Sequence, residues 1–146
     1  MRIIAIGILA LAIASGVAHA QTAGEQARIV GDFERSVAAY IDGATPAPAI
    51  FTLPVAMVFR QLIARALAER DGVAVINGVG AHPHTMILER FPSHELHEFP
   101  RVLQDALPPL PAALDYRLVG HDLVVRDKEA GVIVGVLRNA VGPALT

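Results

Sequence analysis

Apolar residues recur at steps of three and four along two stretches in the first half of the chain. Between Gly24 and Ile41 charged residues fill the intervening positions, which predicts an amphipathic helix with one buried face. A second helix is predicted from Thr52, which can cap its amino terminus, to Arg70-Asp71-Gly72, where glycine can end it. The predicted buried positions are Ile29, Phe33, Val37, Tyr40 and Ile41 in the first helix, and Val55, Val58, Phe59, Leu62, Ile63, Ala66 and Leu67 in the second.

Prolines and glycines divide much of the remaining chain into short elements. Residues 42–48 predict a linker after the first helix, and residues 73–81 fit either a short strand or a loop. Thr85 to Leu88 is a candidate strand between two prolines. Residues 99–107 predict a short helix, and the proline-rich residues 108–111 predict an extended connector after it.

The clearest alternation of apolar and polar residues lies near the carboxyl terminus, in residues 114–119 and 122–127. Gly120-His121 between them predicts a hairpin with a type II′ turn. The resulting register sets Tyr116 opposite Val125 and makes one face apolar. The other face is predicted to meet water, since its positions include Asp115, Arg117, Asp122 and Arg126.

A further run, Val132 to Leu137, has no polar side chain and predicts a strand covered on both faces. Together the elements predict an α+β domain. Two amphipathic helices pack on a small, mainly antiparallel sheet with a carboxyl-terminal β-meander.

The amino terminus has the layout of a secretory signal peptide. Arg2 precedes an uncharged apolar run from Ile3 to Val17, and Ala18-His19-Ala20 has the small-x-small pattern of a cleavage site. The run is shorter than the ~20 residues of a membrane-spanning helix. We therefore predict that residues 1–20 are a cleaved signal and that residues 21–146 form one domain, which is periplasmic or secreted, with no membrane span after cleavage.

The composition narrows the possible functions. The formal net charge is −2, and cleavage would remove Arg2 and make it more negative, which argues against nucleic acid as a partner. The chain has no cysteine, so burial must hold the fold without disulfides and a thiol mechanism is excluded. Neither Ser36 nor Ser93 lies in a Gly-x-Ser-x-Gly motif. We predict no catalytic residue and no cofactor.

The leucine- and proline-rich residues 107–111, followed by Tyr116-Arg117 in a strand and by a valine-rich strand, carry a resemblance. This segment resembles the carboxyl-terminal signature of a group of uncharacterised bacterial exported proteins. The resemblance implies no activity. The group often has an aspartate after the paired aliphatic residues of the last strand, where this chain has Gly135.

Four of the 6 histidines lie close together in the sequence, with Glu89, Glu95 and Glu98 nearby. Imidazole and carboxylate groups can bind zinc or copper, although the spacing lacks the zincin motif. Two interpretations stay open: histidines on the surface of a proline-rich loop, or a metal site. The candidate ligands are His82, His84, His94 and His97.

Two hypotheses for function follow. The first is a non-catalytic, exported protein that binds another macromolecule, such as another envelope protein. The alternative is a periplasmic metal-binding or metal-dependent protein that uses the histidines between His82 and His97.

Overall fold

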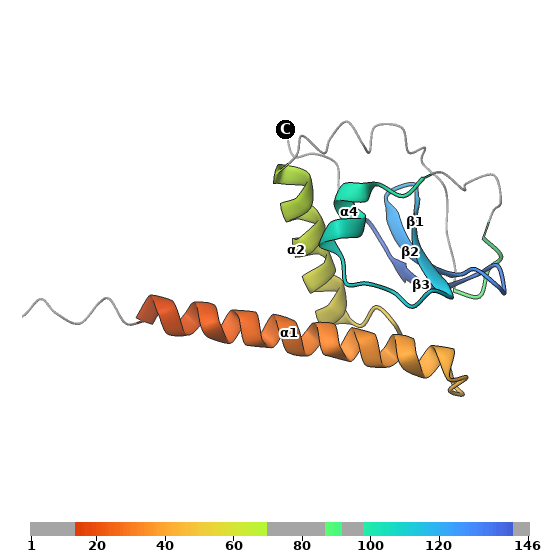
Figure 1. Cartoon of the computed structure of the whole chain (residues 1–146), viewed down its shortest axis with the longest axis horizontal. Helices are drawn as coiled ribbons and strands as arrows, with labels where there is room; N and C mark the ends of the chain where they lie inside the picture. The colour runs from red at the N-terminus through yellow and green to blue at the C-terminus, as the bar shows by residue number, and fades with distance from the viewer. Residues whose placement is uncertain (1–13, 70–86, 92–97, 142–146) are drawn as a thin grey trace, which may run out of the picture.

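The computed structural model describes residues 14–69, 87–91 and 98–141, with side chains from residue 22 onward. This part of the chain contains α1 (Ala14–Ile41), α2 (Leu53–Glu69), α4 (Arg101–Ala106), β1 (Leu114–Val119), β2 (Asp122–Asp127) and β3 (Val132–Leu137). In Figure 1, the amino-terminal end of α2 lies beside the middle of α1, and the two helix axes cross at a steep angle. The sheet lies beside the carboxyl-terminal half of α1. The first half of α1 extends beyond the rest of the domain.

Both long helices agree with the spacing of their apolar residues. The prediction of Ile41 as buried was wrong: its side chain is 44% exposed, because the chain turns away at Gly43, which has a φ of 78°. The Ala56 N–H donates to the Thr52 carbonyl at the start of α2 (2.8 Å), and α2 ends at Glu69. The predicted stop at residues 70–72 lies outside the described residues. Cleavage after Ala20 would fall inside α1 and stays a prediction.

The helices meet the sheet through a cluster of aromatic rings. Phe59 from α2 lies 4.8 Å from the ring of Phe33 on α1, 5.2 Å from Phe51 and 6.2 Å from Tyr116 on β1. Each such pair adds about 0.5–1.5 kcal/mol beyond the burial of its area. Leu103 of α4 is fully buried in the same core. This core fixes the position of α1 relative to β1.

The three strands form an antiparallel sheet in the order β1-β2-β3. Tyr116 pairs with Val125 and Leu118 with Leu123, as the hairpin register predicts. Gly120 has a φ of 61°, the left-handed value that the first central residue of a type II′ turn requires. The predicted α+β architecture, with helices packed on a small antiparallel sheet, is confirmed.

The prediction that the second face of the sheet meets water was wrong. Val119, Val124 and Ile133 are buried there in a small cluster with Phe91. Backbone bonds hold this segment against β3: the Phe91 N–H donates to the Gly131 carbonyl (2.9 Å), and Leu88 donates to Ile133 (2.7 Å). The prediction of a strand from Thr85 to Leu88 was wrong in its described part, since residues 87 and 88 form a turn and Leu88 has a φ of 68°. The bridge to β3 lies further along, where Arg90 pairs with Val132.

The charged residues of this second face are compatible with burial because they pair with one another. Arg126 donates to both carboxylate oxygens of Asp115 (2.7 and 3.0 Å), and Arg117 donates to the same carboxylate (2.9 Å). The Arg126 guanidinium also lies 5.3 Å from the centre of the Phe91 ring. Charge pairing and a cation–π contact lower the cost of covering these side chains.

Gly135 lies in β3 on the face toward the helices. A Cβ atom at this position would stand 3.2 Å from the Cβ of Ile50 and 3.3 Å from the Phe51 ring. These contacts are tighter than a well-packed core tolerates. The close approach explains why glycine occupies the position in this chain.

Candidate interaction groove

A cavity of about 290 Å³ opens between α1 and the connector formed by residues 108–111. Figure 1 shows this part of the chain running from α4 to β1 along the second half of α1. The floor includes the nearly buried side chains of Phe33 and Val37. The full lining, which we call the groove, is Phe33, Glu34, Val37, Ala38, Pro109, Leu110 and Pro111.

The connector is fixed to β1 at both ends. The Tyr116 hydroxyl donates to the Pro108 carbonyl (2.6 Å), and the Leu114 N–H donates to the Pro111 carbonyl (3.0 Å). Burial, and then the nearby carboxylate of Glu34, raise the pKa of Tyr116 far above its ordinary value. The hydroxyl therefore remains a donor. Proline has a nearly fixed φ, so the connector needs little ordering to keep its shape.

A separate contact fixes α1, the opposite wall of the groove. The Tyr40 hydroxyl donates to the Asp127 carboxylate (2.8 Å), which joins the end of α1 to the end of β2. The N–H groups of Ala130 and Glu129 also donate to that carboxylate (2.9 and 3.0 Å). The Ala130 bond is the main reason why the pKa of Asp127 is below its ordinary value. Both walls are thus held by contacts outside the groove.

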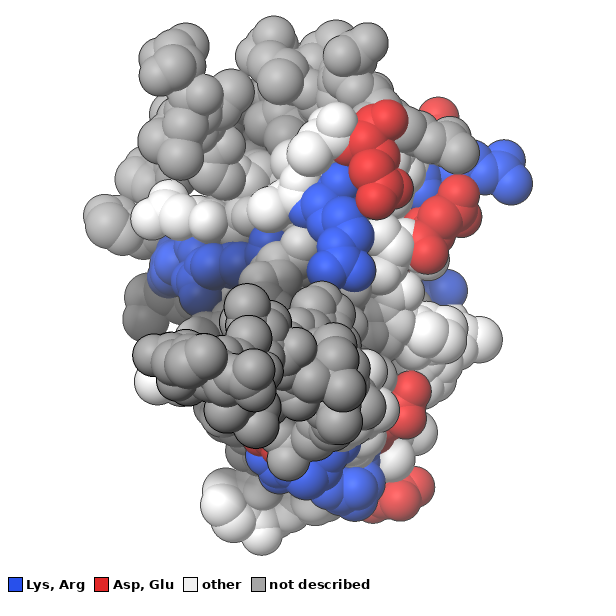
Figure 2. Space-filling view, turned by 90° about the vertical axis from the view of Figure 1, so that its left-hand side faces the viewer, with Lys and Arg blue, Asp and Glu red and all other residues white. Residues whose placement is uncertain are grey.

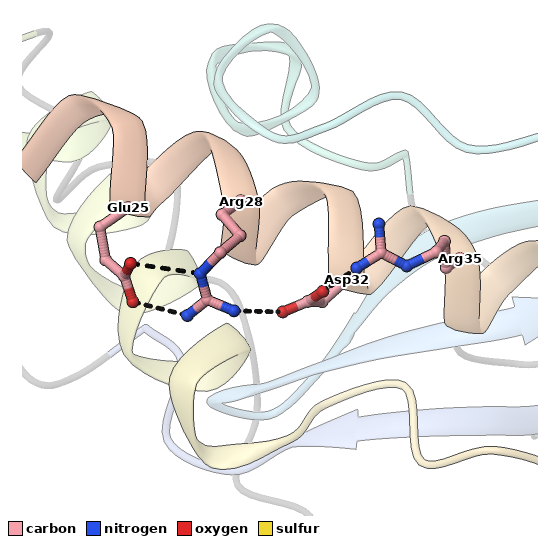
Figure 3. A network of polar contacts seen from close by, with 4 residues as sticks. All are labelled: Glu25, Arg28, Asp32 and Arg35. Carbon is pink, nitrogen blue, oxygen red and sulfur yellow. Dashed lines mark hydrogen bonds and ion pairs between the residues drawn. The ribbon is translucent and has the colours of Figure 1, made fainter.

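The charged residues of α1 differ between its two flanks. On the flank away from the groove, Glu25, Arg28, Asp32 and Arg35 form a continuous row of ion pairs, shown in Figure 3. We call this set the ion-pair row. The carboxylate of Glu34 lies on the other flank and has no hydrogen-bond or ion-pair partner in the described part of the chain. The edge of the groove therefore carries a negative charge that no described residue pairs with.

A second hollow, of about 300 Å³, lies between α2 and α4. Its lining includes charges of both signs, Arg65 with Glu69 and Asp105, over an apolar base. Figure 2 shows acidic side chains beside several of the basic ones on the face that it presents.

The candidate metal ligands His82, His84, His94 and His97 all lie outside the described residues. Their convergence on one ion therefore stays the alternative hypothesis, and their scatter stays the prediction. Within the described ranges, no group of three histidine, aspartate or glutamate residues could hold a metal ion. In the same ranges, no helix has the length and hydrophobicity needed to cross a membrane.

Sequence reasoning identified the connector and the buried stripe of α1, but it did not bring them together. A helical projection could have shown that Glu34 and Ala38 share a flank beside Phe33 and Val37. Which segment packs beside that flank depends on tertiary structure. Comparison of the chain with known protein families, curated proteins and solved structures found no match.

Proposed function

We propose that this chain is an exported, non-catalytic domain that binds another protein of the bacterial envelope through the groove. The observation that carries the proposal is an apolar cavity between two fixed walls, α1 and the connector. The signal-like residues 1–20 support export. The proposal does not require any reacting group in the groove.

The groove has the properties of a site for a partner's anchoring side chain. Its apolar floor can cover a side chain on several sides, and residues at such pockets often dominate binding energy. Pro109, Pro111 and Ala38 are exposed around it, so the edge can contact the surrounding partner backbone. Because both walls are already held by hydrogen bonds, binding would need little ordering of this protein.

A substitution at the wall of the groove tests the proposal. Ala38→Arg would fill the mouth of the groove and place a cation one helical turn from Glu34. The matched control is Ala64→Arg, at an exposed position of α2. The measurement is co-purification from solubilised envelope fractions, with wild-type protein and both variants compared by quantitative mass spectrometry.

We expect one or a few proteins to be retained by the wild type and by Ala64→Arg but lost with Ala38→Arg. Equal retention by all three proteins would contradict binding through the groove.

Export is tested separately. The intact mass of protein from the envelope should correspond to a chain that begins at Gln21, and retention of residues 1–20 would contradict the predicted processing.

The metal-binding alternative requires a specific arrangement of the histidines. At least three of its four histidines would have to place a ring nitrogen ~2.1 Å from one zinc ion. We expect them to be too scattered, because Pro83 and Pro92 favour extended segments around the two histidine pairs. Calorimetric titration with Zn²⁺ should then show only weak binding. A stoichiometric site lost in both His84→Ala and His97→Ala would instead favour the alternative.

A further inference from the structure

We infer that the groove binds an extended peptide segment in which an aliphatic side chain stands beside a lysine or arginine. This inference rests on the proposed function and specifies the chemistry of the partner. The aliphatic side chain would pack on Phe33 and Val37, and the cation would lie at Glu34. Charge complementarity at the edge of the groove is the main argument.

The carboxylates of α1 provide an internal comparison. Glu25 bonds to Arg28 (2.6 Å), and Asp32 bonds to Arg28 (3.2 Å) and also to Arg35. Glu34 stands two residues from Asp32, yet it has no such partner in the described ranges. A cation from outside would find an available carboxylate there, beside an apolar surface that screens it less than bulk water.

The connector adds hydrogen-bond acceptors and few donors. Prolines at positions 108, 109 and 111 have no N–H, so Leu110 supplies the connector's one backbone donor. The carbonyls of Pro109 and Leu110 accept no backbone hydrogen bond from any described residue. A ligand rich in donors therefore fits this wall. An extended peptide offers backbone N–H groups in addition to a lysine or arginine head group.

A second copy of the chain fits the groove less well through α1. The arginines of that helix, Arg28 and Arg35, are already bonded within the ion-pair row. Using either one at Glu34 of another copy would require breaking an existing pair. An acidic segment fits least, since its charge would repel Glu34. These differences favour a basic and aliphatic segment from a different protein.

The test uses two short peptides as probes and the ¹⁵N-labelled protein. The basic probe is the acetylated and amidated pentapeptide GLKLG, and its acidic counterpart is GLELG. We expect the basic peptide to shift the amide resonances of Ala38 and Leu110. It should bind about threefold more tightly than the acidic peptide, the scale expected for one exposed charge pair.

Two variants identify the carboxylate responsible. Glu34→Gln should remove the preference for the basic peptide, while apolar contact with the groove remains. The matched control, Glu25→Gln, makes the same change on the same helix within the ion-pair row and should keep the preference. Both side chains are exposed, so neither change disturbs the core.

Three results would overturn the inference: no shift at the groove with either peptide, equal affinity for the two peptides, or equal effects of the two variants. None of them would by itself contradict the proposed function. Binding through the groove is contradicted instead when Ala38→Arg and Ala64→Arg retain the same proteins. The two experiments therefore separate an incorrect partner chemistry from an incorrect binding surface.

Discussion

The two flanks of α1 carry acidic residues in different surroundings. On one flank, Glu25 and Asp32 bond to arginines three or four residues away along the helix. On the other flank, Glu34 stands beside an apolar groove and has no partner in the described part of the chain. The carboxylates of the first flank pair within the helix itself, whereas the carboxylate of Glu34 pairs with none of the described residues.

The ion-pair row depends on local structure, whereas the groove depends on tertiary structure. The ion-pair row needs only helical geometry, which brings residues three and four apart together. The groove needs the connector to lie against α1, and this depends on the Tyr116 contact with Pro108. It also depends on the sheet beneath both elements.

Disrupting the sheet should unfold the domain and so remove the difference between the two flanks of α1. This is the largest expected effect on stability. Leu123 is fully buried on the face toward the helices, so Leu123→Asp should cost about 4 kcal/mol of stability or more. Asp122→Asn is the control on the opposite face. Asp122 accepts bonds from the Arg138 side chain (2.8 Å) and the Asn139 N–H (2.9 Å), so we expect a loss of about 1 kcal/mol or less. Equal losses in denaturant unfolding would show that the faces are wrongly assigned.

Removing the floor of the groove should have the next largest effect. Phe33 contacts the rings of Phe51 and Phe59 and is 1% exposed, so Phe33→Ala should cost about 3–5 kcal/mol. Arg35→Ala on the other flank should cost far less, because Arg35 pairs with Asp32 in solvent. Denaturant unfolding monitored by circular dichroism measures both changes. A comparable loss for both variants would contradict the difference between the flanks.

Loosening the carboxyl-terminal end of α1 should have a moderate effect that depends on pH. Burial and the bond to Asp127 raise the pKa of Tyr40 from 10.0 to about 12. The hydroxyl therefore contributes stability that is complete below pH 10.0 and is lost as the pH rises toward about 12. Tyr40→Phe should cost about 1 kcal/mol at neutral pH.

The same variant should also reduce the loss of stability over this alkaline range. Unfolding free energies measured at several pH values test both expectations. An unchanged pH dependence in Tyr40→Phe would contradict the role of this hydroxyl. Tyr116, whose pKa is raised still further, should keep its own loss of stability over the same range, so Tyr40→Phe should reduce the pH dependence without abolishing it.

The smallest expected effect compares two carboxylates of α1 directly. Asp32→Asn should cost about 0.5 kcal/mol, because Asp32 pairs with both Arg28 and Arg35. Glu34→Gln should leave stability unchanged, since no described group pairs with this carboxylate. Thermal unfolding at low and high salt measures the difference. A greater loss for Glu34→Gln would show that its charge has a structural role.

Much of the fold could be predicted because its signals are local. The alternation in β1 and β2, with Gly120 between them, determined the register from Leu114 to Asp127. Helical spacing likewise identified α1 and α2, whose ends lie beside Gly43 and Pro54. In each case one short segment contained both the periodic apolar residues and the glycine or proline that marks the end of the element.

Predictions that depended on distant contacts were less successful. The charges of Asp115 and Arg126 suggested a face open to water, but they bond to each other beneath Phe91. The groove was missed for the same reason, since nothing in the sequence near Glu34 indicates that Pro109 packs beside it. Covering a charge or forming a groove depends on which remote segment lies there.

Site-specific photo-crosslinking tests the central claim, that a partner protein occupies the groove, most directly. Ala38 is replaced by p-benzoylphenylalanine, and in a second strain Ala64 on α2 is replaced by the same photoreactive residue. Both positions are exposed. The account predicts a discrete protein adduct from position 38 in living cells and none from position 64. Adducts from position 64 alone, or from neither position, would contradict it.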